Sequence, residues 1–78
     1  MNDQNKLNIQ DAFLNAARKS NTPVDIHITN GYLISEAQVK SFDSYAVLIE
    51  TGGKQMLVYK HAISTIAPET KLQILQES

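Results

Sequence analysis

The spacing of apolar residues changes at Pro23, and this change limits the folds that the chain can adopt. Between Ile9 and Ala17 the apolar residues recur every three to four positions, the period of one face of an α-helix. From Val24 to Ile28 they alternate with polar residues, the period of a β-strand. The chain is therefore predicted to begin with one helix and to continue as strands.

Signals at both ends define the helix, which is expected at about residues 9–20. Asn8 is a favoured N-cap residue, and Arg18 and Lys19 fall in the last turn, where the helix dipole favours cations. Pro23 keeps the residue before it out of the helical conformation. The helix should therefore end just before that proline.

Short extended runs separated by turn residues make up the rest of the ordered chain. We expect strands at 24–28, at 32–34 continuing through 37–42, and at 45–49, 55–59 and 63–66, with turns at Asn30-Gly31, Asp43-Ser44 and Gly52-Gly53. One helix followed by five short strands predicts a mainly β fold, a strongly bent antiparallel sheet that forms a small open barrel.

The chain is interpreted as one domain with a short extension at each end. Residues 1–7 are mostly polar and predict a flexible arm, the domain spans 8–68 with its strands within 24–66, and 69–78 form a C-terminal tail. The tail carries Leu72, Ile74 and Leu75, so it either docks on the domain or stays disordered.

Size and composition predict an oligomer. A domain of 78 residues hides only roughly 60% of its unfolded surface and is marginal alone. It has no cysteine and no cluster of histidine and carboxylate at ligand spacing, so no disulfide, metal or cofactor is predicted. Partner subunits remain as the source of additional stability.

No apolar run is long enough to cross a membrane, and a cytoplasmic protein is expected. The net charge of −1 argues mildly against nucleic-acid binding, although affinity for phosphate depends on where the cations lie.

Several blocks occur in an order and at a spacing that resemble one known family. In sequence order they are Ile9 to Asn15, Asn30-Gly31, Ser41 to Asp43, Gly53 to Gln55, and Tyr59 to Thr65. Together they are similar to the Hfq family of bacterial Sm-like RNA-binding proteins. The resemblance covers about Ile9 to Pro68, and the Lys-His-Ala-Ile-Ser-Thr run is its most specific part.

The resemblance implies an Sm-like fold and a homohexameric ring in which edge strands pair between neighbouring subunits. Members bind uridine-rich single-stranded RNA on the proximal face of the ring and promote pairing of small regulatory RNAs with messenger RNA. By this resemblance, Tyr45 would stack on a base, Lys60 and His61 would contact base edges and phosphate, and Gln10 would bond a uracil edge.

Two further RNA surfaces follow from the same resemblance. Asn15, Arg18 and Lys19 match the basic rim of the ring, and Tyr32 and Gln55 match the distal face, which binds adenine-rich RNA.

The chain departs from the family pattern on the distal face. The segment from Asn30 to Phe42 is one residue longer than usual, Glu36-Ala37 stands where a glycine is usual, and Met56 replaces a polar side chain of some members. We expect a β-bulge at Ser35-Glu36, and distal binding stays open.

Each candidate residue also has an ordinary structural explanation. Tyr45 and Tyr32 are possible packing residues, His27 is expected on the surface or at an interface, and Arg18 and Lys19 suit a helix end whatever they bind. No nucleophile lies near a base and an oxyanion loop, so no enzyme and no small-molecule substrate are predicted. The alternative function is an Sm-like oligomeric scaffold with weak RNA binding.

Overall fold

The computed structural model describes residues 8–74, an N-terminal helix followed by a five-stranded antiparallel sheet. The elements are α1 (Ile9–Ser20), β1 (Val24–Ile28), β2 (Leu33–Phe42), β3 (Ala46–Thr51), β4 (Lys54–Tyr59), the 3₁₀ turn η2 (Lys60–Ala62) and β5 (Ile63–Pro68). The predicted fold class is confirmed. Residues 1–7 and 75–78, and with them the predicted arm and the end of the tail, lie outside the described part.

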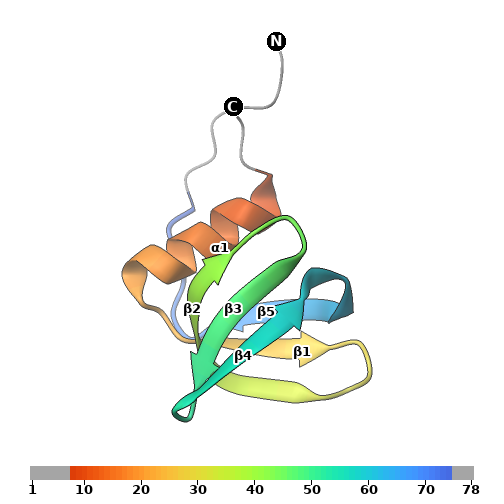
Figure 1. Cartoon of the computed structure of the whole chain (residues 1–78). Helices are drawn as coiled ribbons and strands as arrows, with labels where there is room; N and C mark the ends of the chain where they lie inside the picture. Colours follow the sequence, from red (N-terminus) through yellow and green to blue (C-terminus); the bar gives the residue numbers. More distant parts are fainter. Residues whose placement is uncertain (1–7, 75–78) are drawn as a thin grey trace.

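The helix begins and ends where the sequence predicts. The Asn8 side chain accepts a hydrogen bond from the Asp11 backbone N–H at 2.8 Å, which caps the first turn. Asn21 adopts the left-handed conformation, and its N–H closes the last turn on Ala17 and Arg18. Helix α1 then lies across one end of the bent sheet (Figure 1).

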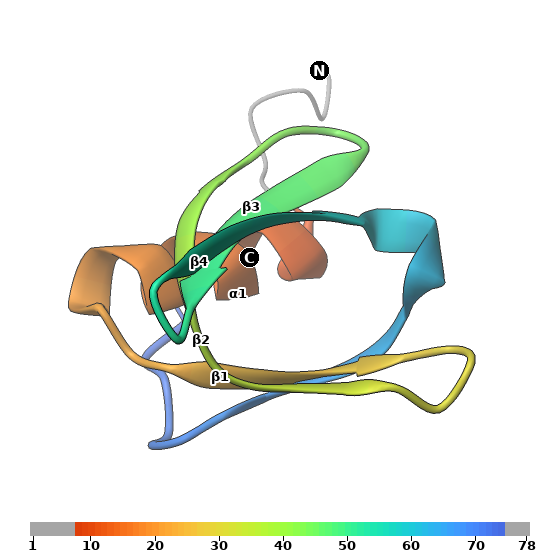
Figure 2. The same ribbon diagram turned by 60° about the horizontal axis from the view of Figure 1, so that its bottom comes forward.

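Strand β2 joins the two halves of the sheet, whose strand order is β4-β3-β2-β1-β5. Its first half pairs with β1 and its second half with β3. Figure 2 shows β2 passing from the layer that contains β1 to the layer that contains β3. The register slips by one residue in both pairings, and such bulges bend a strand.

The first of these irregularities is the bulge expected at Ser35-Glu36. Val24 pairs with Ala37 and Ile26 pairs with Ile34, so two residues of β2 lie opposite one of β1. Glu36 has φ +53°, a left-handed conformation that a side chain makes costly. The Asp25 carboxylate accepts the Glu36 N–H at 3.0 Å and holds the bulge.

Replacing Glu36 with glycine should raise the free energy of unfolding by about 0.5–1 kcal/mol, because glycine adopts positive φ without strain. Chemical denaturation at one protein concentration measures the change. Ser35→Gly is the matched control: Ser35 is outside the positive-φ positions, and glycine there should destabilise by a similar amount, about 0.5–1 kcal/mol. A loss of stability in Glu36→Gly would show that the bulge is not strained.

Two predicted hairpin turns form, with different geometries. Gly52 and Gly53 both have positive φ and Thr51 pairs with Lys54, as in a two-residue hairpin loop. At Asn30-Gly31 the loop is one residue longer. The Gly31 N–H donates to Ile28 O and the Ile28 N–H donates to Tyr32 O, both at 2.8 Å. A three-residue loop with glycine in the left-handed position results.

The core fills the space between the bent sheet and α1. Its fully buried side chains, all under 2% exposed, include Leu14, Val24, Ile26, Val47 and Ile49. Leu72, from the segment after β5, packs against this cluster. The part of the predicted tail before residue 75 therefore docks on the domain. Strand boundaries differ slightly from expectation, with β3 at Ala46–Thr51 and β5 extending to Pro68.

Strands β4 and β5 form the two edges of the sheet. Leu57 and Tyr59 on β4 are 56% and 53% exposed. Large apolar side chains on an open edge strand promote pairing with another chain.

Among the described residues, no helix is long and apolar enough to cross a membrane.

Candidate nucleic-acid interface

Three chain segments bring the predicted proximal residues together. Gln10 lies in the first turn of α1, Tyr45 lies in the turn before β3, and Lys60 and His61 follow β4. The Lys60 N–H donates to the Tyr45 carbonyl at 2.8 Å, which fixes the two backbones side by side. The site is therefore a corner between the helix start and the β3-β4 ladder.

The turn at Asp43 holds Tyr45 outward. The Asp43 carboxylate accepts the Tyr45 N–H at 2.8 Å and the Ala46 N–H at 2.9 Å. These two backbone hydrogen bonds, with the positive charge of Lys60, lower the pKa of Asp43 below its ordinary value. Tyr45 itself is 77% exposed. The packing interpretation of Tyr45 therefore does not hold, and its ring is available to a ligand.

Lys60 is engaged within the protomer. Its ammonium lies 2.9 Å from Asp11 Oδ1 and 5.5 Å from the centroid of the Phe42 ring. The Lys60 side chain is only 9% exposed. An ammonium has three donors, and one of them is directed to the carboxylate. Lys60 thus ties the start of α1 to the end of β4, in addition to any contact with a ligand.

His61 is exposed and lies beside a second aromatic ring. The His61 and Tyr59 rings are stacked, with centroids 6.0 Å apart and planes 18° apart. This spacing is within the range of favourable ring pairs. Tyr59 was not among the predicted site residues, and it restricts the orientation of the imidazole.

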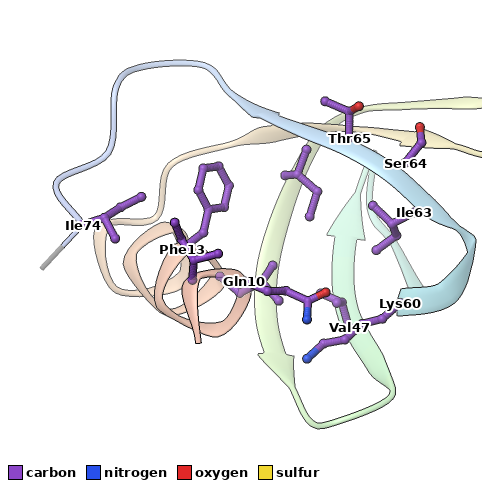
Figure 3. Close-up of a pocket in the computed structure, with 11 residues that line it drawn as sticks. Gln10, Phe13, Val47, Lys60, Ile63, Ser64, Thr65 and Ile74 are labelled. Atoms are coloured by element: carbon purple, nitrogen blue, oxygen red, sulfur yellow. The ribbon is translucent and has the colours of Figure 1, made fainter. Parts of the chain in front are cut away.

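A cavity of about 320 Å³ opens between α1 and β5, next to this corner. Figure 3 shows Gln10 and Lys60 at one end of it, Ile63, Ser64 and Thr65 along the β5 wall, and Phe13 beside Ile74. Its lining is mainly apolar apart from Gln10, Lys60 and the two hydroxyl groups. A planar base with a polar edge matches such a lining.

The predicted rim residues share the C-terminal half of α1. Arg18 donates from Nη2 to Asn15 Oδ1 at 2.6 Å, and both Arg18 and Lys19 are exposed. The two predicted RNA surfaces therefore lie at opposite ends of α1, with Gln10 at the proximal corner and the rim cations in the last turn.

The predicted distal residues lie on different parts of the sheet. Tyr32 follows the first hairpin turn and is 60% exposed, whereas Gln55 is exposed on the edge strand β4. Across the sheet, Gln55 pairs with Glu50 and Glu50 pairs with Gln38, which is six residues further along the chain than Tyr32. His27 is exposed, as expected.

Sequence reasoning missed the residues that support the corner. Asp11 and Phe42 both contact the Lys60 ammonium, and neither contact is predicted by the sequence pattern. The Lys60–Asp11 pair spans 49 positions, and no local spacing predicts contact over that distance. Among the described residues, no group of histidine, cysteine and carboxylate side chains could hold a metal ion.

Comparison with known proteins agrees with this architecture. The Hfq protein family model matches residues 9–73. The chain is 54% identical over 68 residues to the RNA-binding protein Hfq of Clostridium acetobutylicum, an alignment covering 87% of this chain and 83% of that protein. It is 53% identical over 68 residues to the RNA-binding protein Hfq of Bacillus subtilis, covering 87% and 92%.

A solved structure shows the same fold. The crystal structure of the pleiotropic translational regulator Hfq superposes with a TM-score of 0.73 at 38% identity, covering 77% of this chain and 98% of that one. The family match spans nearly all of the described residues and these relatives share about half of their aligned sequence. The chain therefore belongs to the Hfq family.

Proposed function

We propose that this protein is an RNA chaperone that binds uridine-rich single-stranded RNA and promotes pairing of small regulatory RNAs with messenger RNA. The observation that carries the proposal is the proximal corner, where the Lys60 N–H bonds to the Tyr45 carbonyl, His61 follows directly, and the Tyr45 ring and the His61 imidazole are both exposed. Aromatic faces stack on unpaired bases and not on paired ones, whose faces are hidden. The site therefore favours single strands.

The functional assembly is a homohexameric ring. Two open edges, β4 and β5, support this proposal, together with the exposed Leu57 and Tyr59 on β4. Pairing β4 of one copy with β5 of the next continues the sheet and covers both edges. The ring repeats each proximal corner around one axis, so that a weakly charged protomer binds RNA through avidity.

The remaining roles follow from placement. Gln10 reaches a base edge from the helix start, and Asn15, Arg18 and Lys19 contact RNA from the rim. Tyr32 and Gln55 remain the distal-face residues, and the oligo(A) titration below tests them. Because its partners are small RNAs and messenger RNA, the protein acts in the cytoplasm. It catalyses no reaction and needs no cofactor.

The test is a fluorescence anisotropy titration with labelled oligo(U). His61→Ala and Tyr45→Ala should each weaken binding by about tenfold, since one base stack contributes about 1–3 kcal/mol. His27→Ala is the matched control, because His27 is the other exposed histidine, on β1, outside the corner, and should leave the affinity unchanged. Lys60→Ala is a poor first variant, because it also leaves Asp11 without its partner.

Oligo(A) and an RNA duplex complete the titration. Duplex should bind more weakly than oligo(U), whereas tight oligo(A) binding would show that the bulge at Glu36 leaves the distal face functional. Flat curves with every RNA would contradict the proposal and favour the oligomeric scaffold instead.

A further inference from the structure

A second hollow lies at the opposite end of α1 from the proximal corner. It is an open groove of about 470 Å³ between the end of the helix and the segment that follows β5. We call it the tail groove. The helix side contributes Lys19, Ser20 and Thr22, and the tail side contributes Thr70 and Lys71.

The tail side of this groove is held in place. The Glu69 N–H donates to the Pro23 carbonyl at 2.9 Å, and Leu72 packs against the hydrophobic core. Lys71 lies between these two anchored residues. Its backbone position is therefore set by the fold, and the groove is a built feature of the domain.

The charges of the tail groove are unbalanced. Lys19 and Lys71 both line it and both are exposed. Within residues 8–74 neither forms an ion pair, whereas Lys40 pairs with Glu50 and Lys60 pairs with Asp11. Glu69 precedes the groove without lining it. Two like charges around one hollow repel each other, and an anion between them removes that repulsion.

One hydroxyl group adds a donor between the two lysines. The Ser20 hydroxyl donates to the Ala16 carbonyl at 2.8 Å and therefore accepts from the Thr22 hydroxyl at 2.7 Å, so both of these hydrogens are used within the protein. Thr70 also lines the groove. Two ammonium groups and the Thr70 hydroxyl around an open hollow suit a phosphate, which carries charge and several acceptor oxygens.

We propose that the tail groove binds a backbone phosphate of the RNA body, with Lys71 as a rim cation contributed by the C-terminal segment. This inference rests on the proposed function, because it takes RNA as the ligand. It extends the rim from Arg18 and Lys19 on the helix to a residue 52 positions further along the chain. Contacts here are to phosphate alone, so they add affinity without base preference.

Two RNAs separate this groove from the proximal corner. One is a short oligo(U), and the other joins the same uridine end to a long single-stranded body of mixed sequence. Lys71→Ala should weaken binding of the long RNA by roughly three- to tenfold near 0.1 M salt and make the slope of log K against log salt shallower by at least about 0.7. Its affinity for oligo(U) should not change.

Matched variants exclude a general charge effect. Lys54→Ala removes another exposed lysine, from the β3-β4 hairpin, and should leave binding of the long RNA unaffected. Lys71→Arg should restore binding. In Lys19→Ala/Lys71→Ala the losses should fall short of the product of the single losses, because both side chains act on one phosphate.

The outcomes for the two proposals are distinct. Equal losses in Lys71→Ala and Lys54→Ala, or no loss in Lys71→Ala, would overturn the tail groove while oligo(U) binding still supports the proximal corner. If the wild-type protein binds the long RNA through Lys71 but ignores oligo(U), the proximal proposal fails and the tail groove stands. No binding of either RNA overturns both.

Discussion

Leu57→Pro is expected to break the proposed ring into smaller species and to weaken oligo(U) binding by at least about 100-fold, the lower range of gains from multivalency. Pairs in an antiparallel ladder alternate between hydrogen-bonded and non-bonded positions. The Lys60 N–H donates to Tyr45 O, so these two residues form a hydrogen-bonded pair. Val58 and Val47 are the next such pair along the ladder, and Leu57 opposite Leu48 is therefore a non-bonded pair. The Leu57 N–H thus points away from β3 to the open edge, and proline has no N–H to donate there.

Light scattering measures the mass, and far-UV circular dichroism measures whether the strands persist. Leu57→Thr is the control: it removes the apolar side chain but keeps the N–H and a high β propensity, so its ring should remain. Should Leu57→Pro keep the mass of a hexamer, β4 is not the assembling edge.

Asp11→Ala should lower the free energy of unfolding by about 2–3 kcal/mol, because it leaves a mostly buried cation without its partner. Lys60 is 9% exposed and Asp11 26%, so water screens the pair only partly. Removing both charges, in Asp11→Ala/Lys60→Met, should cost less than about 1 kcal/mol, since no unpaired charge is left and an unbranched thioether fills the same space against Phe42. The asymmetry between the two variants is the signature of a buried pair.

Urea unfolding at one fixed protomer concentration measures both variants, since assembly is linked to stability. Glu50→Ala is the control, because it breaks the exposed pair between Lys40 and Glu50, whose charged atoms lie 3.6 Å apart. That change should cost less than about 0.5 kcal/mol. If Asp11→Ala is as mild as Glu50→Ala, solvent screens the Lys60 pair as well.

Local patterns predicted the elements because their causes are local. The N-cap at Asn8, the helix end before Pro23, and the glycine pair at 52–53 each act over a few residues, and each formed as expected. The extra residue before Phe42 produced the expected bulge, since a bulge keeps Val39 on the buried face.

Contacts within the site were less predictable because they join distant segments. Resemblance to the Hfq family placed Gln10, Tyr45, Lys60 and His61 in one site, but it did not reveal that Lys60 is paired. Neither the stacking of Tyr59 on His61 nor the docking of Leu72 follows from periodicity. The docking of Leu72 depends on how the bent sheet brings distant segments together, whereas the stacking of Tyr59 on His61 depends on the 3₁₀ turn that follows β4.

By itself, the sequence determined one helix, five strands, their turns and the family, because apolar period, caps and turn residues act over short distances. Only the tertiary structure decided which charges are satisfied and which stay available. Strand pairing and helix packing place Asp11 against Lys60 and leave Lys19 and Lys71 around one groove. Coulomb interactions depend on distance in space and on burial, and neither quantity is encoded in sequence spacing.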